Sequence, residues 1–258
     1  MVDEGEARVV LITGAASGIG AATSMAFAEA GYRVLLADVD VEAGQRLAAT
    51  LDGDFARCDV GSEVEVAAAV ALALEKFGRL DVHINNAAIL GPTSDIADIE
   101  VADWDRVMAV DLRGAFLGIK HAARAMKPRG RGSILSVASV TGPMGGLGPH
   151  AYSCARHGLI GLTRSAASEL IRSGIRVNAV APGPVVTPMV SNLIGQDLDT
   201  ARTQLAAGSP TGAAIEGADI AAALLFLASD AARHVNGHVL TIDGGMTTAP
   251  ARQAAQRR

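Results

Sequence analysis

Several features that mark particular classes of protein are scarce in this chain. Aromatic residues make up only 3% of its 258 residues, and it has two cysteines, Cys58 and Cys154. The cysteines lie far apart and form no C-x-x-C or His-paired spacing, so we predict neither a disulfide framework nor a metal site. Free thiols fit a reducing compartment, and we expect a cytoplasmic protein.

The chain also lacks an excess of positive charge and any long apolar run. Its net charge is -5, which gives no reason to expect a nucleic-acid or acidic-membrane partner. The acidic start, residues 1–8, has no apolar signal core, and the longest apolar run, residues 220–228, is far too short to span a bilayer. We therefore predict neither secretion nor a membrane span. The short basic tail, residues 249–258, is expected to be a frayed terminus rather than a binding arm.

What the chain does contain is an alternation of short apolar runs and helical patterns along its whole length. This alternation predicts one α/β domain over residues 1–258, with a core of about residues 8–247 and no linker. Strands separated by helices favour a Rossmann-type, doubly wound parallel sheet with helices on both faces. The predicted strands are 8–12, 33–38, 55–58, 80–85, 132–138, 175–180 and 238–242, and the predicted helices are 19–30, 41–51, 63–77, 104–126, 152–173 and 218–229.

A glycine-rich turn, T-G-A-A-S-G-I-G over residues 13–20, connects the first strand to the first helix. Gly14 permits a tight turn, Gly18 lets backbone N–H groups approach a pyrophosphate, and Gly20 lets helix and strand pack closely. Asp38 ends the second strand, where a carboxylate would accept hydrogen bonds from an adenosine ribose. Asp38 would also repel a 2′-phosphate, and the turn has no Lys or Arg to bind one, so we predict NAD rather than NADP. The alternative is a helix-capping turn beside a surface aspartate.

With this turn, the chain resembles the classical short-chain dehydrogenase/reductase family over about residues 8–247. Further motifs agree in order and spacing: Asp59-Val60, Asn85-Asn86-Ala87-Ala88, Pro182-Gly183 with Thr187, and Asn236-Gly237 to Asp243-Gly244-Gly245. The resemblance implies an NAD site and a homo-tetramer or dimer assembled through the helices that contain residues 113–120 and 152–173. It implies these cofactor-binding residues: Gly14, Ser17, Gly18, Ile19, Gly20, Asp38, Asp59, Val60, Asn86, Ala87, Tyr152, Pro182, Gly183, Val185 and Thr187.

The resemblance also identifies the catalytic positions, usually an Asn-Ser-Tyr-Lys tetrad. Ser139 matches the serine that hydrogen-bonds the substrate oxygen, and Tyr152 matches the tyrosine that exchanges a proton with it. Taken alone, Ser139 could be a strand-end cap and Tyr152 an aromatic residue at a helix start. The other two positions depart from the family, with Asp111 in place of Asn and Arg156 in place of Lys.

We predict that the two departures belong together, as a direct or water-bridged ion pair. Arg156 can supply positive charge near Tyr152 but cannot release a proton, and its planar fork pairs readily with carboxylates. Pairing with Asp111 would avoid a buried unpaired guanidinium while offsetting part of its field, so redox catalysis would be slower or shifted to higher pH. The alternative is that Arg156 points to solvent and Asp111 only accepts backbone hydrogen bonds.

Three other features are weaker. His150, two residues before Tyr152, is either an auxiliary acid or base or a loop residue, and His83 is expected in the core or beside the cofactor. Residues 188–212 lie where the family carries its substrate lid. Apolar side chains there favour an apolar or cyclic substrate: Val190, Leu193, Ile194 and Leu205.

The sequence therefore predicts an NAD(H)-dependent oxidoreductase that interconverts a secondary alcohol and a ketone. Two alternatives stay open because fold does not fix function. One is a non-redox enzyme, such as a cyclase, dehydratase or isomerase, for which an altered proton relay would matter least. The other is a catalytically silent binding protein.

Overall fold

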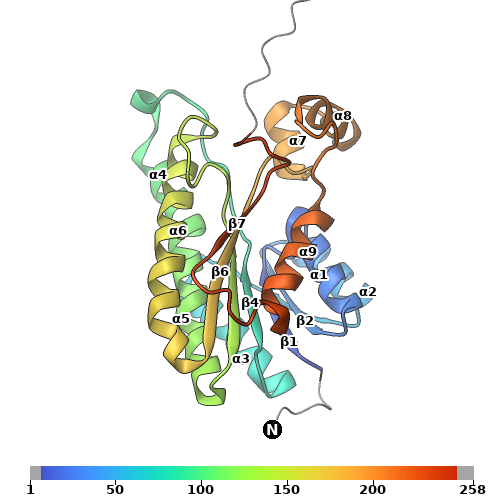
Figure 1. Cartoon of the computed structure of the whole chain (residues 1–258), viewed down its shortest axis with the longest axis vertical. Helices are drawn as coiled ribbons and strands as arrows, with labels where there is room; N and C mark the ends of the chain where they lie inside the picture. Colours follow the sequence, from blue (N-terminus) through green and yellow to red (C-terminus); the bar gives the residue numbers. More distant parts are fainter. Residues whose placement is uncertain (1–6, 249–258) are drawn as a thin grey trace, which may run out of the picture.

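The structure is a computed structural model, and it describes residues 7–248. Seven parallel strands form one sheet in the order β3-β2-β1-β4-β5-β6-β7 (Figure 1). The strands are β1 (Val9–Thr13), β2 (Arg33–Asp38), β3 (Asp54–Arg57), β4 (Val82–Asn85), β5 (Gly132–Val137), β6 (Ile175–Pro182) and β7 (Val239–Ile242). The predicted doubly wound, Rossmann-type fold is confirmed. The predictions for the first six residues and for the basic tail, 249–258, fall outside the described residues.

Helices cover both faces of the sheet. In Figure 1, α1, α2 and α9 lie on one side of it and α4, α5 and α6 on the other. The helices are α1 (Gly18–Glu29), α2 (Val41–Thr50), α3 (Glu63–Phe77), α4 (Val101–Val107), α5 (Gly114–Met126), α6 (His150–Leu170), α7 (Pro188–Ile194), α8 (Leu198–Gly208) and α9 (Gly217–Ala228), with a π-helical turn, η2 (Met108–Arg113), between α4 and α5.

The central strands are apolar in sequence because both faces of the sheet are covered by helices. All five residues of β1 are buried, and they divide alternately between two cores because successive side chains of a strand point to opposite faces. Val9 and Leu11 belong to the core under α3 and α5, while Val10 and Ile12 belong to the core under α1 and α9. A strand buried in this way needs a continuous apolar run rather than an alternating one.

The sheet reverses its winding direction at β1 and β4. The chain leaves β1 toward β2 and β3 on one side, and continues from β4 toward β5, β6 and β7 on the other. The connections that follow these two neighbouring strands run in opposite directions, and open parallel sheets bind ligands at such a point. The glycine-rich turn after β1 and the Asn85-Asn86 motif after β4 meet at this point.

Two segments differ from the sequence prediction in their details. The predicted helix over 104–126 is divided into α4, the π-turn η2 and α5. The predicted lid over about residues 188–212 contains two helices, α7 and α8. Within residues 7–248, no helix combines the length and apolar character needed to cross a membrane.

Candidate active site

A cavity of about 720 Å³ lies at the carboxyl ends of the strands. It extends from Asp38 at the end of β2 to Ser139 and Tyr152 beyond β5, so it joins the predicted cofactor site to the predicted catalytic site. The predicted residues that line it are Gly14, Ser17, Gly18, Ile19, Asp38, Asp59, Val60, Asn86, Ala87, Ser139, Tyr152, Pro182, Gly183, Val185 and Thr187. Three predicted site residues are not among its lining: Gly20, Asp111 and Arg156.

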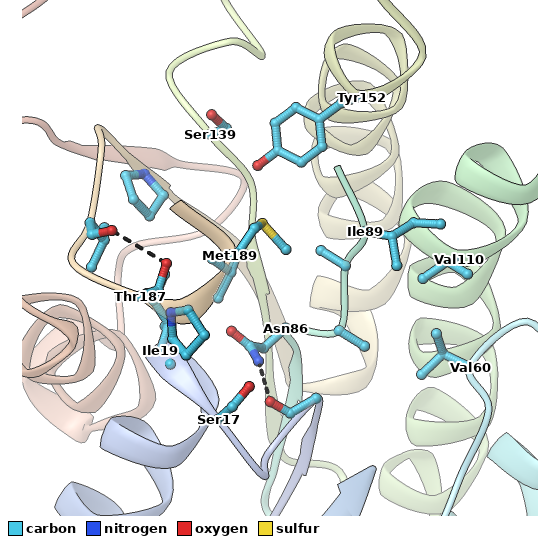
Figure 2. A pocket seen from close by; sticks show the side chains of 18 of the residues that line it. Ser17, Ile19, Val60, Asn86, Ile89, Val110, Ser139, Tyr152, Thr187 and Met189 are labelled. Carbon is cyan, nitrogen blue, oxygen red and sulfur yellow. Dashed lines mark hydrogen bonds between the residues drawn. The ribbon is translucent and has the colours of Figure 1, made fainter. Parts of the chain in front are cut away.

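The glycine-rich turn owes its shape to the absence of side chains. Gly14 has φ +62°, in the left-handed region that favours glycine. A Cβ atom on Gly20 would lie 1.9 Å from the carbonyl oxygen of Gly14, so helix and turn can approach only without it. The Asn86 side chain donates hydrogen bonds to the carbonyl oxygens of Thr13, at 3.0 Å, and Gly14, at 2.9 Å. Figure 2 draws one of these two bonds. The predicted packing role of Gly20 therefore agrees with the geometry.

The amino end of α1 faces the cavity. Ser17 is the N-cap residue, but its side chain makes no capping hydrogen bond, and Figure 2 shows it beside Asn86 in the pocket. The first turn of α1 contains no acidic residue. Free backbone N–H groups and the helix dipole at such an end favour a bound anion, so Ser17, Gly18 and Ile19 could hold a pyrophosphate.

Two carboxylates line the other end of the cavity. The oxygens of Asp38 accept hydrogen bonds from the backbone N–H groups of Ala16, at 2.8 Å, and Asp40, at 3.0 Å. Asp59 accepts one from the backbone N–H of Gly61 at 2.8 Å. These contacts fix both carboxylates against the ends of β2 and β3.

Ser139 and Tyr152 both line the end of the cavity opposite Asp38. Ser139 follows β5, and its Oγ accepts a hydrogen bond from the backbone N–H of Thr141 at 3.2 Å. Tyr152 is in the first turn of α6, and in Figure 2 its hydroxyl points into the pocket on the same side as Ser139. A carbonyl oxygen between the two hydroxyl groups could receive a hydrogen bond from one and a proton from the other.

Asp111 and Arg156 form the direct ion pair that the sequence predicted, with 2.9 Å between Nη2 of Arg156 and Oδ2 of Asp111. Both are buried, with 1% and 3% of their surfaces exposed. Nη1 of Arg156 donates to the carbonyl oxygen of Val137 at 2.9 Å, and Oδ1 of Asp111 accepts from the backbone N–H of Ile89 at 2.8 Å. The solvent-facing alternative for Arg156 is therefore excluded.

Burial and the ion pair with Arg156 have opposite effects on the pKa of Asp111. Burial raises the pKa of the Asp111 carboxyl above its ordinary value, and the nearby Arg156 and the Ile89 N–H only partly oppose this. Burial also disfavours the charged form of Arg156, but Tyr152 and Asp111 outweigh that effect and the pKa of Arg156 is raised. Arg156 thus keeps its positive charge in the interior.

The cavity also has lining residues that the sequence prediction missed. Ile89 and Gly91 closely follow the Asn-Asn-Ala-Ala motif at residues 85–88, which is the signal that could have located them, whereas Val110 lies in η2. The missed lining residues are Val39, Cys58, Ile89, Gly91, Arg106, Val110, Val137 and Ala138. Burial raises the pKa of the Cys58 thiol to about 12, so this cysteine is a packing residue rather than a nucleophile.

The histidines lie apart from the reacting groups. His150 is exposed at the start of α6 and does not line the cavity, so it has the loop-like position rather than that of an acid or base at the site. His83 is buried in β4, where its Nε2 lies 2.9 Å from Oδ1 of Asn85. Burial lowers the pKa of His83 to about 4, so it is neutral at physiological pH.

Part of the predicted lid reaches the cavity. Met189 and Val190 of α7 are lining residues, while Leu193 is 48% exposed. Leu205 of α8 lines a separate cavity of about 140 Å³. The apolar residues of the lid are thus divided between the main cavity, a smaller cavity and the surface.

The main cavity fits a dinucleotide along its length. The carboxylate of Asp38 stands where an adenosine ribose would bind, the amino end of α1 where a pyrophosphate would, and Pro182, Gly183 and Thr187 where the nicotinamide end would. Gly18 and Thr187, which both line this cavity, lie close together, since a Cβ on Gly18 would be 3.2 Å from Cγ2 of Thr187.

Comparisons with known proteins agree with this geometry. A family model described as Enoyl-(Acyl carrier protein) reductase matches residues 14–247. The chain is 47% identical over 247 residues to momilactone A synthase of Oryza sativa subsp. japonica, covering 93% of this chain and 90% of that protein. It is 44% identical over 253 residues to (+)-borneol dehydrogenase 2 of Salvia officinalis, covering 93% and 89%.

One solved structure has a closely similar fold. The crystal structure of levodione reductase has 38% sequence identity and a TM-score of 0.88, covering 94% of this chain and 98% of that one. The chain therefore belongs to the short-chain dehydrogenase/reductase family.

Proposed function

We propose that this protein is an NAD(H)-dependent oxidoreductase that interconverts a secondary alcohol and a ketone on a small apolar or cyclic substrate. The observation that carries the proposal is one continuous cavity. Asp38 and the amino end of α1 line one part of it, and Ser139 and Tyr152 line another. A dinucleotide bound along the cavity would bring its reactive ring to the two hydroxyl groups.

Each catalytic side chain has one task in this proposal. The bound nicotinamide would give a hydride to the substrate carbon or take one from it. Ser139 donates a hydrogen bond to the substrate oxygen and holds it in place. Tyr152 donates a proton to that oxygen during reduction and accepts it during oxidation. The protein thus positions and polarises the substrate, and the cofactor carries the redox chemistry.

The preference for NAD rests on the charge around the ribose site. Asp38 is held in place by two backbone N–H groups, so its carboxylate cannot easily move away from an incoming phosphate. The glycine-rich turn contains no Lys or Arg. Among the described lining residues the one cation is Arg106, which belongs to α4 on the other side of the sheet. Arg57, the neighbour of Asp38 on β3, does not line the cavity and is paired with Glu65. A 2′-phosphate would therefore meet the negative charge of Asp38.

An apolar substrate is supported by the side chains near Tyr152. Ile89, Met189 and Val190 line the cavity, and their side chains offer no charge or hydrogen bond to a polar substrate. Figure 2 shows Met189 on the side to which the Tyr152 hydroxyl points, whereas Ile89 and Val110 lie on the other side of the pocket. Apolar walls of this kind select by shape, and borneol dehydrogenase is the name of a similar protein. We propose that residues 188–212 act as the lid over this substrate.

The experiment is ketone reduction by purified protein with NADH and with NADPH, using a panel of cyclic apolar ketones. Tyr152→Phe removes the proton donor but keeps the ring, so the rate should fall by a factor of about 10²–10⁴. Binding of NADH, followed by its fluorescence, should persist in Tyr152→Phe. A matched control is Tyr32→Phe, which removes the hydroxyl of the other tyrosine of the chain.

Three results would contradict the proposal or a part of it. Product formation without net oxidation of NADH would identify a non-redox enzyme. Tight NADH binding without conversion of any substrate would favour a binding protein. Equal rates in wild type and Tyr152→Phe would remove Tyr152 from the mechanism even if reduction occurs.

We also propose a homo-oligomer, a tetramer or dimer, assembled through α5 and α6. Phe116 on α5 is 46% exposed, and a partner subunit would cover it. Light scattering after size-exclusion chromatography gives the mass directly. A monomer at micromolar concentration would contradict this part.

A further inference from the structure

Arg57 lies beside the proposed ribose site but does not line the cavity. It is the partner of Asp38 in the register between β2 and β3, and neighbouring strands of a sheet are about 4.7–4.9 Å apart. Ala37 and Ala56, the preceding residues of the two strands, both contribute to the core under α3 and α5. Because successive side chains alternate between the faces of a sheet, Asp38 and Arg57 start on the same face. A cation is therefore attached next to the carboxylate that would bind the ribose.

The direction of the Arg57 side chain is set by Glu65, in the first turn of α3. Oε2 of Glu65 accepts hydrogen bonds from Nη1 of Arg57 and from the backbone N–H of Asp59, the latter at 2.9 Å. The backbone contact fixes the carboxylate of Glu65. The Arg57 side chain is 57% exposed and has room to turn, yet within residues 7–248 its ion pair is with Glu65 and none joins it to Asp38.

These charges act close to the cavity, as the buried thiol of Cys58 shows. Cys58 lines the cavity, and its pKa is raised chiefly by burial. The carboxylates of Glu65, Asp59 and Asp38 add to the rise. The guanidinium of Arg57 opposes it. The one cation of this group is therefore within electrostatic reach of the cavity wall, and Glu65 compensates its charge.

We propose that Glu65 is a positioning residue for cofactor choice, because it holds Arg57 away from the adenosine ribose and so adds to the preference for NAD that Asp38 gives. Released from Glu65, Arg57 would be a partner for a 2′-phosphate, since a guanidinium binds phosphate through two parallel hydrogen bonds. The inference rests on the proposed function, because it concerns the same cofactor. It requires the two carboxylates to act together: with Asp38 intact, a released Arg57 pairs with that carboxylate instead.

The test measures the dissociation constants of NADH and NADPH for the purified protein by fluorescence titration. Glu65→Gln alone should change the ratio of NADPH to NADH affinity by less than about threefold. Asp38→Asn with Glu65→Gln should raise this ratio about tenfold above that of Asp38→Asn, because Arg57 then gains charge-assisted hydrogen bonds to the phosphate. Glutamine can still accept the hydrogen bond from the backbone of Asp59, so the start of α3 is kept.

Two further variants separate the position of the charge from its amount. Glu63→Gln removes the same charge from the same turn of α3, but Glu63 contacts side chains of α5, so it should add nothing to the effect of Asp38→Asn. Arg57→Gln, added to the double variant, should return the ratio to that of Asp38→Asn alone. A purely structural role of Glu65 would not depend on Arg57 in this way. Glu65→Ala, which removes the acceptor altogether, replaces Glu65→Gln if the amide still holds the guanidinium or the double variant does not fold.

The outcomes distinguish this inference from the proposed function. If neither glutamine nor alanine at position 65 raises the ratio above that of Asp38→Asn, while NADH still binds, the inference is overturned and the proposed function stands. A further rise that persists in the presence of Arg57→Gln would also overturn it, because the gain would then come from overall charge. If the wild type binds neither dinucleotide, the proposed function fails and the inference fails with it.

Discussion

The two ends of the cavity are built by different means. At the cofactor end, backbone groups and short side chains at strand ends make the site, as with Gly14, Ser17 and Asp38. At the catalytic end, the environment of Tyr152 depends on the buried pair of Asp111 and Arg156, which joins η2, β5, α6 and the segment after β4. The first end therefore depends on the local course of the backbone, whereas the second depends on one buried ion pair between distant segments. A pair of compensating substitutions in one contact can change the charge near a catalytic group while preserving the fold.

The largest expected effect is on the stability of the catalytic end. Asp111→Ala leaves the buried Arg156 without its carboxylate, which should lower the free energy of unfolding by about 3–5 kcal/mol in urea titrations. Asp105→Ala removes a carboxylate from an exposed site on α4 and is the control. The double variant Asp111→Ala with Arg156→Met should recover much of the loss. Equal stability of Asp111→Ala and Asp105→Ala would mean that the pair contributes nothing to the fold.

The second largest expected effect is a pH dependence of stability, and it comes from His83 in β4. His83 is neutral in the fold, with its pKa lowered to about 4 chiefly by burial, while an unfolded histidine titrates near pH 6.5. Between these values the unfolded state binds more protons, so the free energy of unfolding should decrease as the pH falls from about 6.5 to about 4. The decrease should reach about 3 kcal/mol, at about 1.4 kcal/mol for each unit of pKa difference.

Acidic residues also titrate in this range, so the measurement compares variants. His83→Gln lacks the titrating group and should lose less stability between pH 7 and pH 4.5 than the wild type. The control His234→Gln removes an exposed histidine and should behave like the wild type. If His83→Gln and wild type lose the same stability on acidification, the buried imidazole is not the cause.

A smaller effect should appear at the cofactor end. Gly20→Ala would place a Cβ atom 1.9 Å from the carbonyl oxygen of Gly14 and 2.6 Å from Nδ2 of Asn86. Relief requires movement of the turn, at a cost of about 1–3 kcal/mol, and NADH affinity should fall with it. Gly161→Ala, on an open face of α6, is the matched control because nothing lies within 4 Å of its added Cβ. Unchanged NADH affinity in Gly20→Ala would show that the turn adapts.

The smallest expected effect is on the preference for NADH over NADPH. Asp38→Asn removes the negative charge at the ribose site, so the ratio of NADPH to NADH affinity should rise about tenfold, equivalent to about 1.4 kcal/mol. Asp59→Asn is the comparison, because Asp59 also lines the cavity but its carboxylate is bound to Gly61. A ratio that rises equally in both variants would mean that the preference comes from overall charge rather than from Asp38.

Much of this protein could be predicted from its sequence because the relevant signals are local. Buried strands require apolar runs, helices require their periodicity, and the turn after β1 requires glycine at fixed positions. These requirements predicted the parallel sheet and the glycine-rich turn, whereas the site residues Ser139 and Tyr152 came from the resemblance to the family. They missed Ile89 and Val110, because no local pattern states that the segment after β4 and η2 face the same cavity.

The tertiary structure alone decided how the two unusual residues act. The sequence determined that an aspartate and an arginine occupy two positions of the site, and it predicted that they pair. It could not determine that η2 is a π-helical turn, that Val137 and Ile89 complete the contacts, or that Arg156 lies behind the Tyr152 ring and outside the cavity. Those facts depend on where four segments, distant along the chain, come together in one core, and no stretch of sequence contains that information.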